Sequence, residues 1–430
     1  MNFGNWFGYV WLPGLVAFQS IPGTGALRTA FLLIGIGHTL KLSLSDKPVR
    51  LALPKLEGWL LMLLIVWLVI QNIAFSADSR TTLPNFMSEW LKLLLMVGLG
   101  VQLARVACAN TQSASWIMAG LFAGHFLHVI ATLVRQGWSL ATLGRMAVGP
   151  SILGGYDLVS PFVTGAFGFL LAEVVLRISR LRWLPMSNSW LAVMIVATVV
   201  AQGMLQAKAG LLVMLIMLLV VGIAVSARGG GKMVVLACAL CSVLLIAGTL
   251  ATSDRWSGVF ATVADELKSP TSIPTSSDIG SVPDGREESA WLRLTWARQG
   301  IQGILANPLG IGYGANAFGR YLESIGGPSG FVSSHSGWID FALANGIVGL
   351  VLLLALFAAI FRTNWHSYQS GSVAGLAAVL VLVNFVVRSA VDGVLSGSRM
   401  TGFSFVAAML WVYAYSMDRS SEGKSARASN

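Results

Sequence analysis

The chain has few charged residues and few cysteines for its length. Only 11% of its 430 residues are Asp, Glu, Lys or Arg, whereas 55% are hydrophobic, and this balance excludes a soluble globular protein. Its 3 cysteines are too few for a disulfide framework, and Cys238 and Cys241 lie within an apolar run, outside any redox-motif context. No Asp-x-Asp pair occurs, so the sequence has no evident magnesium site. We therefore expect a membrane protein that uses no metal ion or other cofactor.

Other absences exclude nucleotide partners, nucleic acid and a cleaved leader. Gly310, Gly312 and Gly314 have the spacing of a phosphate-binding loop, but no Gly-Lys-Ser/Thr sequence follows them. The net charge of +10 would favour nucleic acid in a soluble protein, but here the basic residues lie in short loops between apolar runs, a distribution that orients membrane proteins. Residues 1–11 lack the basic region and cleavage site of a secretory signal, so the first apolar run is expected to remain as a helix.

Long apolar runs recur from end to end and predict an all-α polytopic membrane protein. A helix needs about 17 to 25 apolar residues to cross a bilayer. Twelve such runs occur, near 6–21, 25–40, 58–75, 87–107, 114–134, 158–177, 190–205, 210–226, 233–251, 337–361, 372–388 and 399–416. The loops that then face inward hold more Lys and Arg than the short outward ones, which predicts that both termini are cytoplasmic.

The spacing of the runs divides a single membrane domain into three parts. Nine helices are expected in residues 1–251 and three more, with a short cytoplasmic tail, in residues 337–430. Between them, residues 252–336 form one long connection, predicted to be periplasmic and to contain helices. Because loops of this length in compact proteins are usually functional, we expect the active part of the molecule here.

One helix within this loop can be delimited from its ends. Asp284, followed three residues later by Glu287, resembles a capping box, and Asn307-Pro308 is a stop signal, so a helix of about twenty residues is expected between them. Arg293 lies on the apolar side of this helix, near Trp296. Its inward position requires an anionic partner, which is either an acidic residue of the loop, Glu287 or Glu288, or a bound ligand.

Four basic side chains are expected to meet at the outward end of the bundle. Lys208 lies in the turn before the eighth run, Arg388 at the end of the eleventh, Arg293 in the loop helix and His335 just before the tenth run. Arginine binds phosphate in bidentate fashion, and ionisable groups at membrane depth usually mark a substrate site. The four residues therefore predict an anion site at the depth of the lipid headgroups.

His335 is the candidate catalytic residue of this site. Ser333 or Ser334 is expected to cap the tenth run, so that the imidazole lies at a helix N-terminus. The positive end of the helix dipole favours the neutral form of the imidazole. A neutral imidazole can take a proton from a sugar hydroxyl. Ser336 and Trp296 are expected to support it. Asp392, four residues after Arg388, either orients that arginine or neutralises it.

Each of these residues also has a purely structural interpretation. Lys208 and Arg388 are equally compatible with ordinary cations at the membrane interface, and a single histidine at a helix entrance is more often a hydrogen-bonded interface residue than a base. His125 and His128, three residues apart in the fifth run, either form a proton relay or serve helix packing. Packing is favoured, because Gly120 and Gly124 on the same run predict close helix contact.

Three motifs in residues 200–400 resemble those of the bacterial O-antigen ligase superfamily. This superfamily includes lipopolysaccharide O-antigen ligases, O-antigen polymerases and protein O-oligosaccharyltransferases. The motifs are His335-Ser336 followed at nine residues' distance by Gly346-Ile347-Val348-Gly349, Arg293-Leu294-Thr295-Trp296 with Asn307-Pro308-Leu309-Gly310-Ile311-Gly312, and Gln206-Ala207-Lys208-Ala209-Gly210. The N-terminal half of the chain resembles the family only in hydropathy.

The resemblance implies a glycosyltransferase of the bacterial inner membrane with its active site facing the periplasm. In that family a twelve-span bundle moves a glycan from undecaprenyl diphosphate to an acceptor hydroxyl. By resemblance, His335 activates the acceptor and Arg293 holds the diphosphate. The family usually has arginine where this chain has Lys208, and lysine offers a point charge in place of a planar fork. The sequence stops shortly after the last run, as in the lipopolysaccharide ligases, so lipid A-core is the expected acceptor and the polymerase and the protein-glycosylating enzymes are the alternatives.

Two functions of other classes remain open at the level of sequence. A transporter would also have twelve spans, but it would place ionisable groups near the membrane midplane and show internal repeats, neither of which is evident here. A non-catalytic glycolipid-binding protein would keep the basic pocket but would have no need of His335.

Overall fold

A computed structural model describes most of the chain. The described residues are 3–19, 21, 23–45, 54–76, 79–109, 111–144, 153, 156–205, 207–229, 236, 238–239, 241–243, 254–268, 287–312, 314–327, 330, 332–393, 395 and 397–428. They form helices joined by turns, with no strand among them, so the predicted all-α class is confirmed for this part of the chain.

Every predicted apolar run except 233–251, which lies largely outside the described residues, is helical. The helices are α1 Phe3–Ala17, α2 Gly25–Ser45, α3 Lys55–Ile70 with a π-helical continuation η1 Gln71–Phe75, α4 Ser79–Ala109, α5 Thr111–Leu143, α6 Tyr156–Ile178, α7 Asn188–Met204, α8 Lys208–Ala227, α13 Gly337–Gln369, α14 Val373–Val391 and α15 Gly397–Ala428. Eight helices of the described part are long and apolar enough to cross a membrane, namely α3 with η1, α4, α5, α6, α8, α13, α14 and α15.

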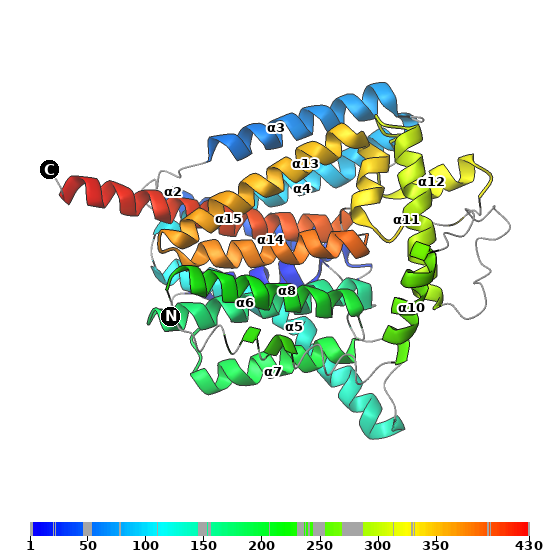
Figure 1. The fold of residues 1–430 in the computed structure, drawn as a ribbon. Helices are drawn as coiled ribbons and strands as arrows, with labels where there is room; N and C mark the ends of the chain where they lie inside the picture. The colour runs from blue at the N-terminus through cyan, green and yellow to red at the C-terminus, as the bar shows by residue number, and fades with distance from the viewer. Residues whose placement is uncertain are drawn as a thin grey trace.

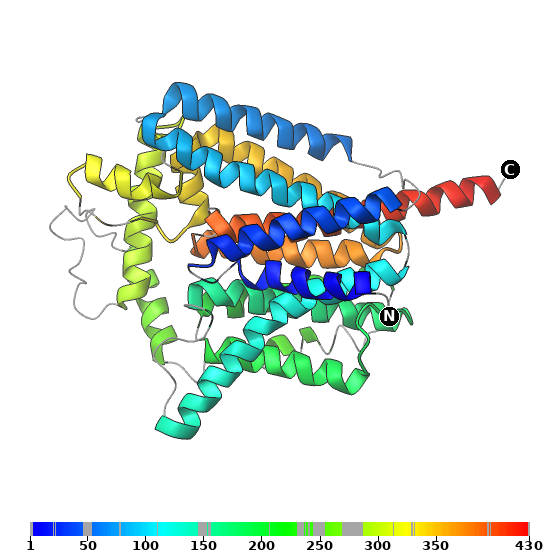
Figure 2. The same ribbon diagram turned by 180° about the vertical axis from the view of Figure 1, so that it is seen from behind.

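These helices run side by side in one bundle. In Figure 1, α3 is at the top of the bundle, with α13, then α14, then α8 below it, and the blue and cyan N-terminal helices cover the back in Figure 2. The close contact predicted from Gly120 and Gly124 is confirmed, because a Cβ on these residues would lie 2.8 and 2.6 Å from side chains of α1. His125 and His128 bind backbone carbonyls at 2.8 and 3.1 Å, as expected for helix packing.

The long connection between residues 252 and 336 forms helices at one end of the bundle. These are α10 Asp254–Lys268, α11 Glu288–Ala306, the short 3-10 turn η2 Gly314–Asn316 and α12 Ala317–Ser324. Both α10 and α11 run across the ends of the bundle helices (Figure 1). The predicted end of α11 before Asn307-Pro308 is confirmed. Asp284 lies outside the described residues, and the cap is Glu287, whose carboxylate accepts a hydrogen bond from the backbone N–H of Ala290 at 2.7 Å.

Helix α13 is broken at Gly346, and the segment after α11 forms hydrogen bonds with the backbone groups at the break. Gly346 has φ 74° and ψ 173°, far from helical values, which leaves backbone groups on both sides without partners inside the helix. The segment supplies them through Ile311 N–H to the Leu343 carbonyl (2.9 Å), Gly312 N–H to the Ala344 carbonyl (3.0 Å) and Ile347 N–H to the Pro308 carbonyl (2.9 Å). Two of the three sequence motifs thus form one structural unit.

We expect Gly346→Ala to destabilise this unit. A Cβ there would lie 2.5 Å from the carbonyl carbon of Leu309, and the backbone conformation is one that only glycine adopts readily, so the cost should be about 1–3 kcal/mol or more. Thermal unfolding of the detergent-solubilised protein measures it. Gly98→Ala in α4 is the matched control, since its Cβ would meet nothing within 4 Å. Equal unfolding temperatures for the two variants would contradict the expectation.

Candidate active site

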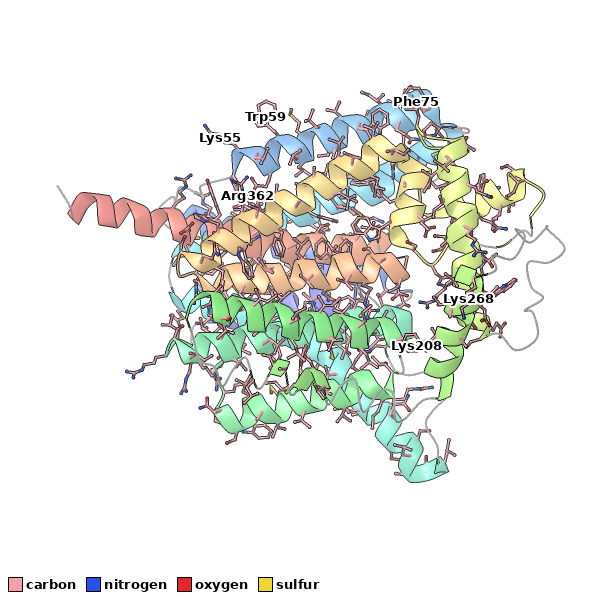
Figure 3. All side chains as sticks on the ribbon, viewed as in Figure 1. Lys55, Trp59, Phe75, Lys208, Lys268 and Arg362 are labelled. Atoms are coloured by element: carbon pink, nitrogen blue, oxygen red, sulfur yellow. The ribbon has the colours of Figure 1, made fainter. Side chains whose placement is uncertain are left out.

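The four basic residues proposed from the sequence lie at the end of the bundle that carries α10–α12. Lys208 is the first residue of α8, Arg388 is in the last turn of α14, Arg293 is on α11, and His335 precedes α13. Figure 3 shows Lys208 at this end, whereas Lys55 lies at the opposite end. The fold therefore brings together residues that are separated by up to 180 positions in the chain.

Helix α11 connects α8 to α14 through two polar contacts. At its start, Glu287 forms an ion pair with Lys208 at 3.6 Å, with both side chains partly exposed. One turn and a half later, Arg293 donates from Nη1 to the backbone carbonyl of Val391, at the end of α14, at 3.2 Å. Glu287, which the sequence offered as a partner for Arg293, thus pairs with Lys208 instead. Both cations remain half-buried at the rim of the bundle.

The next turn of α11 contacts His335. The ring of Trp296 is stacked on the imidazole, with 5.0 Å between the centroids and 18° between the planes. Trp296 is buried on a small cluster that includes Phe318 and Tyr321 of α12, and burial raises the pKa of the Tyr321 phenol. His335 itself is exposed. The imidazole therefore lies over a rigid aromatic surface, one helical turn from Arg293.

The predicted capping serines do not cap α13. Its N-cap is Ser336, which makes no capping hydrogen bond through its side chain. The Ser334 hydroxyl binds Ser336 by accepting from its N–H (3.2 Å) and donating to its carbonyl (3.1 Å), and Ser333 donates to the carboxylate of Asp340 at 2.6 Å. The serine prediction is wrong because this acid in the first helical turn competes for the hydroxyl. Asp340 was not among the residues that the sequence suggested.

Arg388 is the most deeply buried of the basic residues, with an exposed fraction of 1%. The expected contact with Asp392 is present, since Nη1 donates to its carboxylate at 2.9 Å, and Nη2 donates to the hydroxyl of Ser160 at 2.6 Å. The backbone carbonyl of Asp392 in turn accepts from Gly337 N–H at 3.0 Å. Asp392 therefore joins the start of α13 to the end of α14 through its backbone carbonyl, while its carboxylate pairs with Arg388.

A chain of hydrogen bonds extends from Arg388 to the turn before Lys208. The Ser160 hydroxyl donates to Oε1 of Gln202 at 2.9 Å, and Nε2 of Gln202 donates to the Ala207 carbonyl at 3.1 Å. Neither Ser160 nor Gln202 was identified from the sequence, where each is one polar residue inside an apolar run. The only indication in the sequence is that a polar side chain buried in a membrane helix needs a hydrogen-bond partner.

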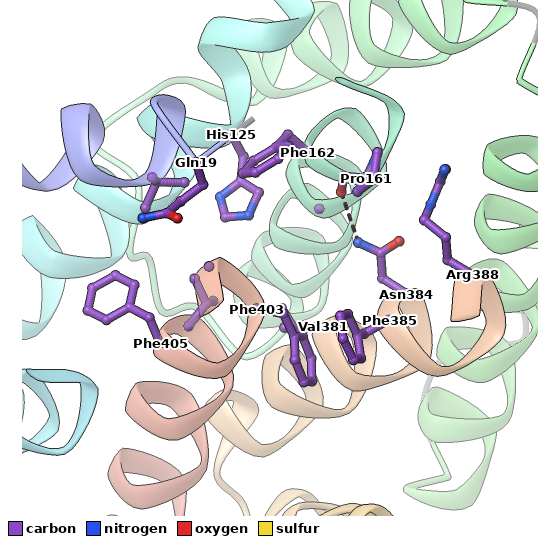
Figure 4. A pocket seen from close by; sticks show the side chains of 14 residues that line it. Gln19, His125, Pro161, Phe162, Val381, Asn384, Phe385, Arg388, Phe403 and Phe405 are labelled. Atoms are coloured by element: carbon purple, nitrogen blue, oxygen red, sulfur yellow. Dashed lines mark hydrogen bonds between the residues drawn. The ribbon is translucent and has the colours of Figure 1, made fainter. Parts of the chain in front are cut away.

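An apolar cavity lies on the inner side of Arg388. Together with its opening to solvent it has about 630 Å³ of empty volume, and it is lined by residues of α1, α5, α6, α14 and α15. Phenylalanines form much of the wall, and the polar contributions come from Gln19, His125, Asn384 and Arg388 (Figure 4). Asn384 donates to the Pro161 carbonyl at 3.0 Å. Arg388 thus lines this apolar cavity while its guanidinium binds Asp392 and Ser160.

The residue types gathered at this end of the bundle are chemically able to bind an anion and to exchange a proton. In the described part of the chain, no three His, Cys, Asp or Glu side chains gather into a possible metal site. Lys208 and Arg293 provide fixed positive charge at the rim, where a phosphate can reach it. His335 is exposed beside Trp296, which is one turn of α11 from Arg293, and can exchange a proton with a bound molecule.

Comparison with known proteins shows a similarity over part of the chain. Residues 190–354 match a family model described as O-antigen ligase, and no curated protein matches the chain at a significant level. The matched segment contains Lys208, Arg293 and His335, whereas Arg388 lies outside it. The family indicates an enzyme that transfers lipid-linked sugars, and the eight apolar helices agree with its membrane environment. Residues 190–354 are thus similar to the O-antigen ligase family, and the eight long apolar helices indicate a multi-pass membrane protein.

Proposed function

We propose that this protein transfers an O-antigen glycan from undecaprenyl diphosphate to a sugar hydroxyl of lipid A-core. The proposal is supported by α11, which carries Arg293 and, one turn later, the Trp296 that stacks on His335, at the bundle end that also holds Lys208. A diphosphate needs the cations and an acceptor hydroxyl needs the base. One helix positions both.

In the proposed reaction, His335 takes the proton from the acceptor hydroxyl. The oxygen attacks the anomeric carbon of the donor, and the bond from that carbon to the diphosphate breaks with inversion of configuration. Arg293 and Lys208 stabilise the negative charge that grows on the departing undecaprenyl diphosphate. Arg388 is buried and paired with Asp392, and it supports the site by holding α13 and α14 together. Its guanidinium can contact the donor only from the side of the cavity that it lines. Because fixed cations supply the charge, the transfer is proposed to need no metal ion.

The proposal includes a topology of twelve spans in the bacterial inner membrane. The eight apolar helices are completed by α1, α2, α7 and residues 233–251, which puts both termini in the cytoplasm and α10–α12 in the periplasm. The cations Lys55 and Arg362 at the end opposite to Lys208 (Figure 3) support this orientation, since basic residues favour the cytoplasmic side.

Reconstitution with defined substrates tests the proposed function. The purified protein is supplied with an undecaprenyl diphosphate glycan and with lipid A-core, a second lipid-linked glycan or an acceptor protein, each with and without a chelator. We expect elongated lipid A-core, undiminished by the chelator. Elongation of the second glycan or of the protein would assign the polymerase or the protein-glycosylating activity, and loss in chelator would refute the metal-free mechanism. Donor binding without any product would indicate a glycolipid-binding protein.

Arg293→Ala in the same assay tests the diphosphate site. Hydrogen bonds to charged groups contribute about 1.5–3 kcal/mol, so kcat/KM for the donor is expected to fall about ten- to hundredfold. Arg320→Ala is the control, because this exposed cation lies at the same end of the molecule and forms an ion pair with a neighbouring acid, Glu323, at 3.1 Å. Equal kcat/KM values for the two variants would remove Arg293 from the proposed site.

A further inference from the structure

The backbone of His335 has an unusual conformation that its neighbours must maintain. Its φ is +58°, and among the described residues other than glycine only Arg180 shares a positive φ. This left-handed region is disfavoured for residues with a Cβ and persists where the surrounding structure imposes it, most often at functional sites. The side chain of His335 is exposed, so the constraint must come largely from the residues before it in the turn.

The constraint comes from the carboxylate of Asp340, in the first turn of α13. Its Oδ1 accepts a hydrogen bond from Ser334 N–H at 2.8 Å, and its Oδ2 accepts from the Ser333 hydroxyl at 2.6 Å. The same hydroxyl accepts from the backbone N–H of His335 at 3.0 Å. One carboxylate thus holds the two residues before the histidine and, through one hydroxyl, the histidine backbone itself.

Packing keeps this carboxylate in place and away from water. The exposed fraction of Asp340 is 8%. Gly393, just after α14, covers it so closely that a Cβ there would lie 2.7 Å from the Ser333 hydroxyl and 3.4 Å from Oδ2 of Asp340. A carboxylate at such depth is costly unless it is fully bonded or paired with positive charge. The hydrogen bonds of the Asp340 carboxylate go to the turn that carries His335, and the two side chains also interact electrostatically.

We propose that Asp340 is a positioning residue for His335. Its hydrogen bonds hold the Ser333-Ser334-His335 turn so that the imidazole remains stacked on Trp296 and directed to the acceptor. Its negative charge stabilises the imidazolium that forms when His335 takes the acceptor proton. A base oriented by a third group is the general arrangement of activated nucleophile sites. The inference rests on the proposed function, in which His335 is the base.

The test compares kcat with the donor KM in Asp340→Asn. An asparagine can still accept from Ser334 N–H and contact Ser333, so the turn should fold, but the negative charge and one acceptor are lost. Because displacing a catalytic group by about 1 Å costs up to about 10²-fold, we expect kcat to fall about ten- to hundredfold with the donor KM within about twofold of wild type. Asp265→Asn, on the exposed surface of α10, is the matched control and should leave both constants unchanged.

Ser333→Ala provides a second test that does not depend on how Asp340→Asn folds. It removes only the hydroxyl between the carboxylate and the His335 backbone, and kcat is expected to fall severalfold at an unchanged donor KM. Unchanged kcat in either folded variant overturns the positioning role, as does a parallel change of kcat and KM with a lowered unfolding temperature, which indicates a merely structural residue. Full activity of His335→Ala would instead refute the proposed base, so the two failures are distinguishable.

Discussion

Replacing His335 with alanine is expected to lower the rate of glycan transfer about 10²- to 10⁴-fold, the contribution that a general base typically makes. Without the imidazole, the acceptor hydroxyl must lose its proton to water as the new bond forms. The donor KM should change little, because the proposed diphosphate contacts, Arg293 and Lys208, are on other elements. Initial rates at saturating and limiting donor separate the two constants.

Two further variants make this result specific to the imidazole. His335→Asn also removes the base, but asparagine adopts a positive φ more readily than alanine, so a loss of activity cannot be attributed to backbone strain. His366→Ala removes an exposed histidine near the far end of α13 and should be fully active. Retention of more than about a tenth of the wild-type rate in His335→Asn would contradict a role as general base.

Arg388→Met is expected to cause the largest loss of stability in the molecule. It removes the guanidinium but keeps most of the side-chain volume, and it leaves the buried carboxylate of Asp392 without its positive partner. Breaking a buried ion pair from one side costs about 3–5 kcal/mol. Because the Asp392 backbone also binds Gly337 N–H, the disturbance should reach the start of α13 and abolish transfer. Thermal unfolding and transfer rate are measured on the same preparation.

The double variant Arg388→Met, Asp392→Leu separates the cost of the unpaired charge from the loss of the arginine. Removing both charges should restore most of the stability, whereas transfer should stay slow because the bond between Arg388 and Ser160 is still missing. Disruption of the exposed pair Arg320–Glu323 is the control and should cost about 0–1 kcal/mol. An Arg388→Met protein as stable as that control would show that the buried pair is not important for stability.

The helices of the bundle were predictable because a membrane restricts the choices of the backbone. A segment in the bilayer must satisfy its own hydrogen bonds, so an apolar run of sufficient length becomes a helix, and every described run did so. The number of spans was less predictable. The runs at α1, α2 and α7 are helical but are not among the eight long apolar helices, because length and hydropathy near the threshold do not show by themselves whether a helix crosses.

The ends of the helices were predicted only where one residue determines them. Pro308 stops α11 as expected, because a proline restricts the residue before it. The cap of α11 and the role of Ser333 were misjudged, since several acceptors compete for each free N–H or hydroxyl. The Ser333 hydroxyl donates a hydrogen bond to the Asp340 carboxylate at 2.6 Å. No rule of residue spacing predicts this contact.

By itself the sequence determined the residue types of the site, namely a histidine and three cations beside long apolar runs, together with the membrane class, because composition and helix length are local properties. Only the tertiary structure decided that Arg388 is buried against Ser160, 228 positions away, that Lys208 pairs with Glu287, and that Trp296 supports His335. The physical reason is that such contacts depend on how helices distant in the chain pack together, and many packings satisfy the same local pattern of apolar and polar residues.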